Sequence, residues 1–276
     1  MPADPSMLHP HTAPVARPRR WRGALVVACA AAPVLGALAL PRIGQDPAYH
    51  AFADARAWAG VPSAANVLSN ALFLAVGAAG VIAVAARAAR FADARERLPW
   101  LTFFASVALI GPGSAWYHLA PSNAALVWDR LPMAAAFGAV LAAVVGERIR
   151  PAAGARLLAP LVTLGVLSVA YWHFTEARGA GDLRPYVLVQ LYPMAAIPLL
   201  SALFPARYTH GADWLVALAL YGVAKAVELG DAAVFRAGGI VSGHTLKHVL
   251  AALALAVLLR MLVRREPLPG AAPLSG

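Results

Sequence analysis

Two histidines near the C-terminal end of the sequence, His244 and His248, stand four residues apart. On a helix, residues at this spacing lie on one face, so both imidazoles can reach the same ion. A third histidine, His118, ends an apolar stretch much earlier in the chain. Three neutral imidazoles are a typical ligand set for Zn²⁺ and leave a fourth position open for water. The three residues therefore predict a metal site, with zinc as the expected ion.

Ser114 and Asp129 accompany these histidines. Ser114 precedes His118 by four residues, so its hydroxyl is expected one helical turn below the imidazole. Asp129 lies in the first turns of the next apolar stretch. A carboxylate near a metal can orient water and accept its proton. Each residue also has a plainer interpretation, such as a histidine that bonds a neighbouring helix or an Asp129–Arg130 ion pair, but together they favour a metal site.

The elements that must position these residues are long apolar segments. Hydrophobic residues make up 61% of the 276 residues and charged residues only 13%, and the mean hydropathy is +0.66. A soluble domain has about 25% charged residues. Runs of about 20 apolar residues can cross the hydrocarbon core as helices. The segments are residues 23–40, 65–86, 100–119, 125–145, 156–173, 185–204, 213–230 and 244–263. They predict an all-α integral membrane protein.

The flanking regions complete the predicted domain plan. Residues 1–22 are rich in proline, histidine and arginine and are expected to form a disordered basic tail, and residues 264–276 a second tail. Segment 23–40 is predicted to be a retained signal anchor, with a cleaved signal peptide as the alternative. Residues 41–263 form the main helical domain. The net charge of +10 does not indicate nucleic-acid binding, because the arginines lie between apolar segments. With one cysteine, Cys29, an intrachain disulfide is impossible.

The distribution of arginine predicts the topology. If the N-terminus is cytoplasmic, the inner segments carry fifteen arginines and the outer segments five. This bias follows the positive-inside rule and places both termini in the cytoplasm, as expected for a bacterial inner-membrane protein. The candidate polar residues then share the outer, periplasmic third of the membrane. They are Ser69, Asn70, His118, Asp129, His244 and His248.

Several motifs resemble those of the alkaline ceramidase family. The stretch Gly111-Pro112-Gly113-Ser114-Ala115-Trp116-Tyr117-His118 resembles the family's G-x-G-S-x-x-(F/Y)-H. The pair His244 and His248 resembles its terminal H-x-x-x-H, and residues 66–70 resemble its N-x-x-S-N. Asp129 follows His118 at the family's spacing. The resemblance covers about Tyr49 to Val263. It extends to the wider superfamily, which includes adiponectin-receptor-like proteins and GPI-remodelling lipases.

The resemblance implies a seven-helix fold, a metal and a reaction. Segment 23–40 would be an additional N-terminal transmembrane helix. The implied ligands of Zn²⁺ are His118, His244 and His248, with Asp129 activating water and Ser114 stabilising the oxyanion. The family cleaves the amide of ceramide to a sphingoid base and a fatty acid. The family's aspartate is commonly followed by glutamate, whereas Arg130 follows here. The glutamate that precedes the N-x-x-S-N stretch in the family has no counterpart here, which argues against dependence on Ca²⁺, the ion that animal members bind. In this respect the sequence resembles the bacterial branch of the family.

A second polar group lies on segment 213–230 and just after it. Lys225 and Glu228 are three residues apart and can pair on one helix face, and Asp231 follows. Either they form a buried ion pair that joins helices, or a carboxylate supports a ligating histidine. Ser69 and Asn70 are expected to support the site or to contact substrate.

Three other functions remain open at this point. The chain could be another zinc-dependent lipid hydrolase that acts on an ester or a different amide. It could be a non-catalytic receptor with structural zinc, or a transporter with a polar site at the midplane. The clustering of polar residues toward one face disfavours the transporter. Asp129 beside an open metal position disfavours the receptor.

Overall fold

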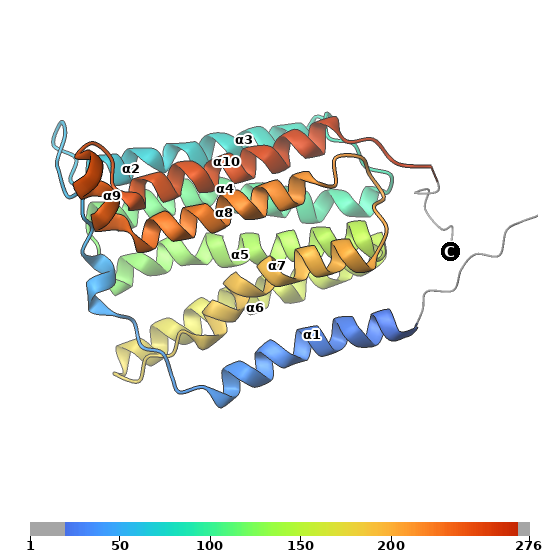
Figure 1. Cartoon of the computed structure of the whole chain (residues 1–276), viewed down its shortest axis with the longest axis horizontal. Coiled ribbons are helices and arrows are strands. Elements are labelled where there is room, and N and C mark those ends of the chain that lie inside the picture. Colours follow the sequence, from blue (N-terminus) through green and yellow to red (C-terminus); the bar gives the residue numbers. More distant parts are fainter. Residues whose placement is uncertain (1–19, 270–276) are drawn as a thin grey trace, which may run out of the picture.

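The protein is a bundle of helices whose axes run nearly parallel to its long direction (Figure 1). The structure is a computed structural model and describes residues 20–269. Most of the predicted N-terminal tail and the end of the C-terminal tail lie outside this range. The described residues contain helices and two isolated bridges but no β-sheet. The prediction of an all-α protein is confirmed.

The helices follow the predicted apolar segments closely. In chain order they are α1 (Arg20–Ala39), α2 (Ala64–Ser69), α3 (Ala71–Ala85), α4 (Arg97–Leu119), α5 (Asn123–Arg148), α6 (Pro151–Ala177), α7 (Arg184–Leu203), α8 (Asp213–Leu229), α9 (Asp231–Gly238) and α10 (Gly243–Arg264), with short 3₁₀ turns η2 (Pro47–His50) and η3 (Ala94–Glu96). The first helix begins at Arg20, a few residues earlier than expected.

Seven spans in residues 20–269 are long and apolar enough to cross a membrane, as an integral membrane protein requires. α2 and α3 together make one of these spans. We expected eight, and the difference is α8. With 17 residues it is about 25 Å long, which is shorter than a hydrocarbon core of about 30 Å. It nevertheless packs against α7 and α10 as part of the bundle.

The predicted segment 65–86 is divided into α2 and α3 at Asn70. The carbonyl oxygen of Asn66 accepts hydrogen bonds from the side chains of both Ser69 (3.0 Å) and Asn70 (2.8 Å). Side chains that bond to nearby carbonyls in this way compete with the helix's own backbone bonds. The backbone N–H of Asn70 bonds to Val67 instead, at 3.3 Å. The interruption lies beside the histidines.

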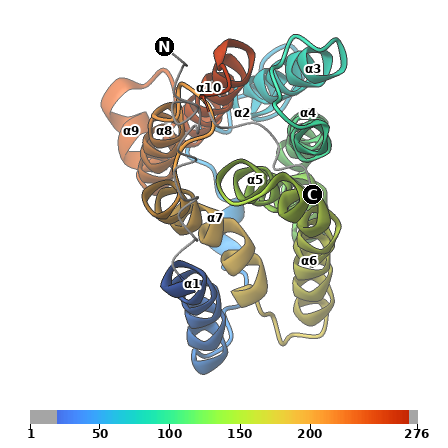
Figure 2. The same ribbon diagram turned by 90° about the vertical axis from the view of Figure 1, so that its right-hand side faces the viewer.

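α5 is the central helix, and α1 lies at the edge of the bundle. Viewed from the end, α5 lies between α4, α6 and α7, whereas α1 lies beside α7 (Figure 2). α5 is the most buried of the candidate spans. Its close packing on α6 depends on small residues. An added Cβ at Gly154 would lie 2.5 Å from the carbonyl oxygen of Ala142, and one at Gly165 would lie 2.6 Å from that of Ala134.

We call the end of the bundle that holds His118, Asp129 and His244 the histidine end, which is on the left in Figure 1. The opposite end, where α4 begins and α10 terminates, contains a buried ion-pair network around Arg265. Its guanidinium donates to Glu147 at 2.7 Å and lies 3.8 Å from Glu96. Glu96 also accepts from Arg207 at 2.9 Å and from the hydroxyl of Tyr208 at 2.5 Å. Every carboxylate of this network has a partner.

Candidate metal centre

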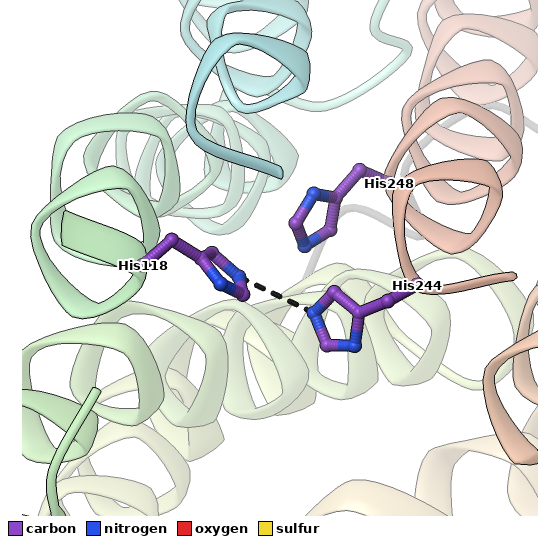
Figure 3. Close-up of side chains that lie close together, drawn as sticks. All are labelled: His118, His244 and His248. Carbon is purple, nitrogen blue, oxygen red and sulfur yellow. Dashed lines mark hydrogen bonds between the residues drawn. The ribbon is translucent and has the colours of Figure 1, made fainter. Parts of the chain in front are cut away.

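Three histidines from two helices converge inside the histidine end. His118 comes from the last turn of α4, and His244 and His248 come from the first turns of α10 (Figure 3). All three are buried, and one ligand nitrogen from each lies within 4.8 Å of the other two. The Nε2 atoms of His118 and His244 are 3.2 Å apart. Two ligands at about 2.0–2.1 Å from one tetrahedral ion are about 3.3 Å apart, so the spacing fits a shared metal.

The hydrogen bonds of Ser69 determine which nitrogen of His248 is free. A serine hydroxyl has one proton, and that of Ser69 goes to the carbonyl oxygen of Asn66, which can only accept. Ser69 Oγ therefore accepts from Nδ1–H of His248 at 2.8 Å. A neutral His248 then has its lone pair on Nε2, which is buried and has no partner among the described residues. An orphaned, oriented imidazole nitrogen is what a metal ligand requires.

The other two histidines are enclosed by Phe52, from the loop between α1 and α2. Its ring centroid lies 4.6 Å from that of His118 and 4.5 Å from that of His244. His118 Nδ1 is also buried without a hydrogen-bond partner in residues 20–269. His244 Nε2 lies 3.0 Å from the ammonium of Lys247. The three-imidazole donor set and the unpartnered Nε2 of His248 fit a metal ion, whose identity the geometry leaves open.

Two glycines of the Gly111–His118 motif bring neighbouring helices close to the site. An added Cβ at Gly113 would lie 2.3 Å from the carbonyl oxygen of Trp128 in α5. One at Gly111 would lie 3.1 Å from the carbonyl oxygen of Asn70 and 2.9 Å from Leu74. Larger residues at these positions would push α3 and α5 away from α4. The glycines therefore place Ser114 next to Asp129, the residue that follows Trp128.

The structure brings Ser114 and Asp129 together. Both are buried, at 3% and 9% exposure, and the serine side chain hydrogen-bonds to the carboxylate. They line one cavity together with His248. This places a potential proton acceptor beside the histidine cluster, on a helix that approaches from the other side.

The cavity extends from these polar groups into the middle of the bundle and has a volume of about 260 Å³. Its walls are mainly apolar side chains from α4, α5, α7, α8 and α10, among them Phe103, Val140, Ile197 and Leu258. His248 and Leu258 are ten residues apart on α10, a rise of about 15 Å. The cavity therefore has a polar end at the histidines and a long apolar remainder.

The second predicted polar group divides into two parts. Glu228 accepts from Lys247 at 2.9 Å and also pairs with Lys225, and all three side chains line the cavity. The predicted Lys225–Glu228 pair is thus present, and it joins α8 to α10 through Lys247. Glu228 does not bond to a histidine ring directly.

Asp231 binds the start of α10 and the covering loop at once. One carboxylate oxygen accepts from the backbone N–H of His244 at 2.7 Å, and the other accepts from that of Ala53 at 2.9 Å. Asp231 therefore contacts the backbone and not the imidazole. Ala53 directly follows Phe52, so the loop is fixed where it covers the histidines.

Other contacts hold the same loop. His50 bonds through its two ring nitrogens to Tyr117 and Asn123, each at 2.9 Å. Asp54 receives a two-point contact from Arg56, with both distances 2.8 Å. These hydrogen bonds from Arg56 hold the pKa of Asp54 below its usual value. The loop is therefore an ordered part of the site.

Asn70 and Asn66 form a scaffold beneath the ligands. Both are fully buried. Asn70 donates to the backbone of Asn66, whose side-chain oxygen accepts from Thr245 at 2.6 Å. This contact links α2 to α10 between the two histidines. Asn70 supports the site and does not contact a histidine.

Sequence reasoning missed Phe52, Lys247 and Gln45. Lys247 carried a signal, because it lies three residues after His244 and so shares a helix face with it. Phe52 and Gln45 come from a loop that the tertiary fold places over the site. No periodic pattern in the sequence identifies them.

A comparison with models of known protein families finds no match, and neither does a comparison with curated proteins. The resemblance to alkaline ceramidases therefore depends on the motifs themselves. The structure brings the histidines, Asp129 and Ser114 of those motifs to one place.

Proposed function

We propose that this protein is a zinc-dependent hydrolase of membrane lipid amides, with ceramide or a related N-acyl lipid as its substrate. The observation that carries the proposal is the continuity of the site with its cavity. His248, one of the three buried histidines, lines one end of the cavity together with Asp129, and an apolar space about 15 Å long leads away from them. An extended acyl chain of roughly twelve carbons has this length. An amide at the end of such a chain would lie beside Asp129.

His118, His244 and His248 would hold the zinc ion. When bound, zinc would supply Lewis acidity toward water and the substrate carbonyl. Ser69 accepts the hydrogen bond from Nδ1–H of His248, and this keeps the lone pair of Nε2 directed into the site. The burial of the three rings excludes competing water from the ligands.

Asp129 is assigned the proton transfers. Its carboxylate accepts a proton from the attacking water as the new carbon–oxygen bond forms. It then delivers this proton to the amide nitrogen as the carbon–nitrogen bond breaks. The products are a carboxylic acid and an amine.

Ser114 is assigned a role that follows from its contact with Asp129. While Asp129 is ionised, the serine proton is directed to the carboxylate. Once Asp129 has accepted a proton it can donate to Ser114, which frees the serine proton to turn toward the carbonyl oxygen. One such donor typically contributes about 3 kcal/mol to transition-state stabilisation.

The test compares hydrolysis with metal content in purified protein. A panel of fluorescent lipid amides and matched esters is incubated with the wild type, His244→Ala, Asp129→Asn and the control His173→Ala, whose ring lies on α6 away from the cluster. We expect hydrolysis of an N-acyl sphingoid base by the wild type and the control only. Zinc should be retained in Asp129→Asn and lost in His244→Ala.

Two results would contradict the proposal. Faster cleavage of the esters than of the amides would assign the site to a lipid esterase. A zinc-loaded protein that cleaves nothing in the panel would leave a metal centre without this activity, and a receptor would then be the better interpretation.

A further inference from the structure

A buried arginine at the histidine end has an aromatic cage but no counter-ion. Arg130 follows Asp129 in α5 and is only 5% exposed. Its guanidinium carbon lies 4.2 Å from the ring centroid of Trp172, 4.9 Å from that of Tyr186 and 5.6 Å from that of Tyr49. No carboxylate in residues 20–269 forms a salt bridge with it. The rings compensate part of the charge but cannot neutralise it.

The hydrogen-bond donors of Arg130 are only partly used. Its Nη2 donates to the side-chain oxygen of Gln45 at 2.7 Å. Its Nη1 is buried and has no acceptor among the described residues, and the same holds for the indole N–H of Trp172. Both groups can only donate. A buried donor without an acceptor is costly, so this pair indicates a place for an acceptor that the chain itself does not supply.

The charges around the cavity lead to the same conclusion. Three cationic side chains line it, Arg130, Lys225 and Lys247, against two carboxylates, Asp129 and Glu228. Glu228 pairs with both lysines, and Asp129 is hydrogen-bonded to Ser114. The lining therefore carries one more cation than carboxylates, and Arg130 is the cation there that forms no salt bridge within residues 20–269.

We propose that Arg130 binds an anionic oxygen group, a carboxylate or a phosphate, in the headgroup of the lipid amide. This inference rests on the proposed hydrolase function and names the substrate class. The guanidinium fork matches the paired oxygens of both groups, and its charge strengthens each hydrogen bond. With the acyl chain in the apolar part of the cavity and the amide at Asp129, the headgroup lies beside the next residue, Arg130. Ceramide is uncharged there and would leave this arginine unpaired.

The experiment uses substrates that share one acyl chain and differ only in headgroup charge. They are an N-acyl amino acid with a free carboxylate, its methyl ester, an N-acyl aminoethyl phosphate and the matching N-acyl ethanolamine. Each is tested on the wild type, Arg130→Gln, Arg130→Lys and the control Arg236→Gln, which removes an exposed cation from α9 at the same end. The measured quantity is kcat/KM.

We expect the wild type to prefer one of the anionic substrates over its neutral partner by roughly 10- to 100-fold, the range for a hydrogen bond to a charged group. Arg130→Gln should remove this preference, so that charged and neutral partners differ in kcat/KM by no more than about twofold, whereas Arg130→Lys should keep part of it. Arg236→Gln should behave as the wild type. The carboxylate and phosphate arms show which anion the site accepts.

Three results would overturn the inference. Equal kcat/KM for charged and neutral partners in the wild type would exclude headgroup charge as a determinant. An equal loss on both substrates in Arg130→Gln would mean that Arg130 contacts a part that they share, such as the released fatty acid. The same loss in Arg236→Gln would indicate general electrostatic attraction.

A binding measurement separates this inference from the hydrolase proposal. Binding of dodecyl phosphate and of dodecanol is titrated in lipid nanodiscs. The chain has seven tryptophans, so occupancy is reported by the fluorescence change that the wild type shows and Trp172→Phe lacks. Tighter binding of the phosphate that disappears in Arg130→Gln supports the anion site even if no amide is cleaved. Equal binding of both compounds rejects it, whatever the activity.

Discussion

Each end of the bundle buries an arginine among three aromatic rings, but only one of the two arginines has a carboxylate partner. At the opposite end, Arg265 lies against Phe91, Trp100 and Tyr208 and is also paired with Glu147. At the histidine end, Arg130 has a similar cage and only the neutral side chain of Gln45 as a partner. The cages are alike, so the missing carboxylate is what distinguishes the two sites.

This difference extends to the groups around each arginine. The Nη2 of Arg265 lacks a hydrogen bond but lies 3.8 Å from Glu96. At the histidine end, His118 Nδ1, His248 Nε2 and Arg130 Nη1 have no partner of either kind in the described part of the chain. Buried polar groups that satisfy one another belong to the fold itself, whereas a cluster of unsatisfied imidazole and guanidinium nitrogens indicates a place for ligands. We therefore assign a structural role to the opposite end and propose ligand binding at the histidine end.

The largest expected effect lies at the structural end. Arg265→Met would leave Glu147 without its principal partner, and removing one member of a buried pair typically costs about 3–5 kcal/mol of unfolding free energy. Arg130→Met leaves no carboxylate unpaired and should cost about 1–2 kcal/mol. Thermal unfolding in detergent measures both. Equal destabilisation by the two substitutions would contradict the comparison.

His248→Ala should affect the metal more than the fold. A structural zinc site binds with roughly 10–16 kcal/mol in total, so one ligand of three or four contributes about 3 kcal/mol, or roughly a hundredfold in affinity. Metal bound per protein is measured after dialysis against a graded chelator series. His173→Ala is the matched control, and Arg265→Met should keep its metal in whatever fraction stays folded. Full metal occupancy in His248→Ala would remove this residue from the ligand set.

Ser69→Ala should weaken the metal site by a smaller factor. Without Ser69, Nδ1 of His248 loses its acceptor and the ring loses its fixed tautomer, which typically lowers metal affinity about 10- to 100-fold. The control is Ser201→Ala on α7, because the hydroxyl of Ser201 has no hydrogen-bond partner in residues 20–269. If the two serine variants bind metal equally well, Ser69 has no part in orienting the ligand.

The smallest effect concerns an ion pair where α7 begins, between its first residue, Arg184, and Asp182 in the loop before it. Arg184 bonds to Asp182 at 2.7 Å and holds the pKa of that carboxyl at about 2. Because this value lies below that of the unfolded chain, the pair stabilises the fold above about pH 4, and the effect is lost as the pH falls toward 2. We expect about 1 kcal/mol or less. Thermal unfolding of wild type and Asp182→Asn between pH 6 and pH 2 should converge at the acidic end.

Helix positions and the convergence of the three histidines were largely predictable from the sequence. The spacing of His244 and His248 requires only that the segment be helical, and the apolar runs make it so. The exception among the helices is the interruption at Asn70, which arises from side chains that bond to the carbonyl of Asn66. Local polar competition of this kind is invisible to a count of apolar residues.

The cover of the site was not predictable, because it depends on how a loop folds back. Phe52 and Gln45 belong to a segment without helical periodicity, and their contacts are with residues far along the chain. The sequence places Arg130 directly after Asp129 but does not reveal that its charge lacks a carboxylate partner. Only the structure shows that its neighbours are aromatic rings and that Asp129 is directed to Ser114.

The carboxylate of Asp231 has a mechanical consequence. Its two oxygens hold the backbone N–H groups of Ala53 and His244, so the loop that covers the site and the first turn of the ligand helix share one anchor. A displacement of the loop at Ala53 pulls on the same side chain that fixes the position of His244. The position of the cover and the position of the first histidine of α10 therefore depend on one side chain, that of Asp231.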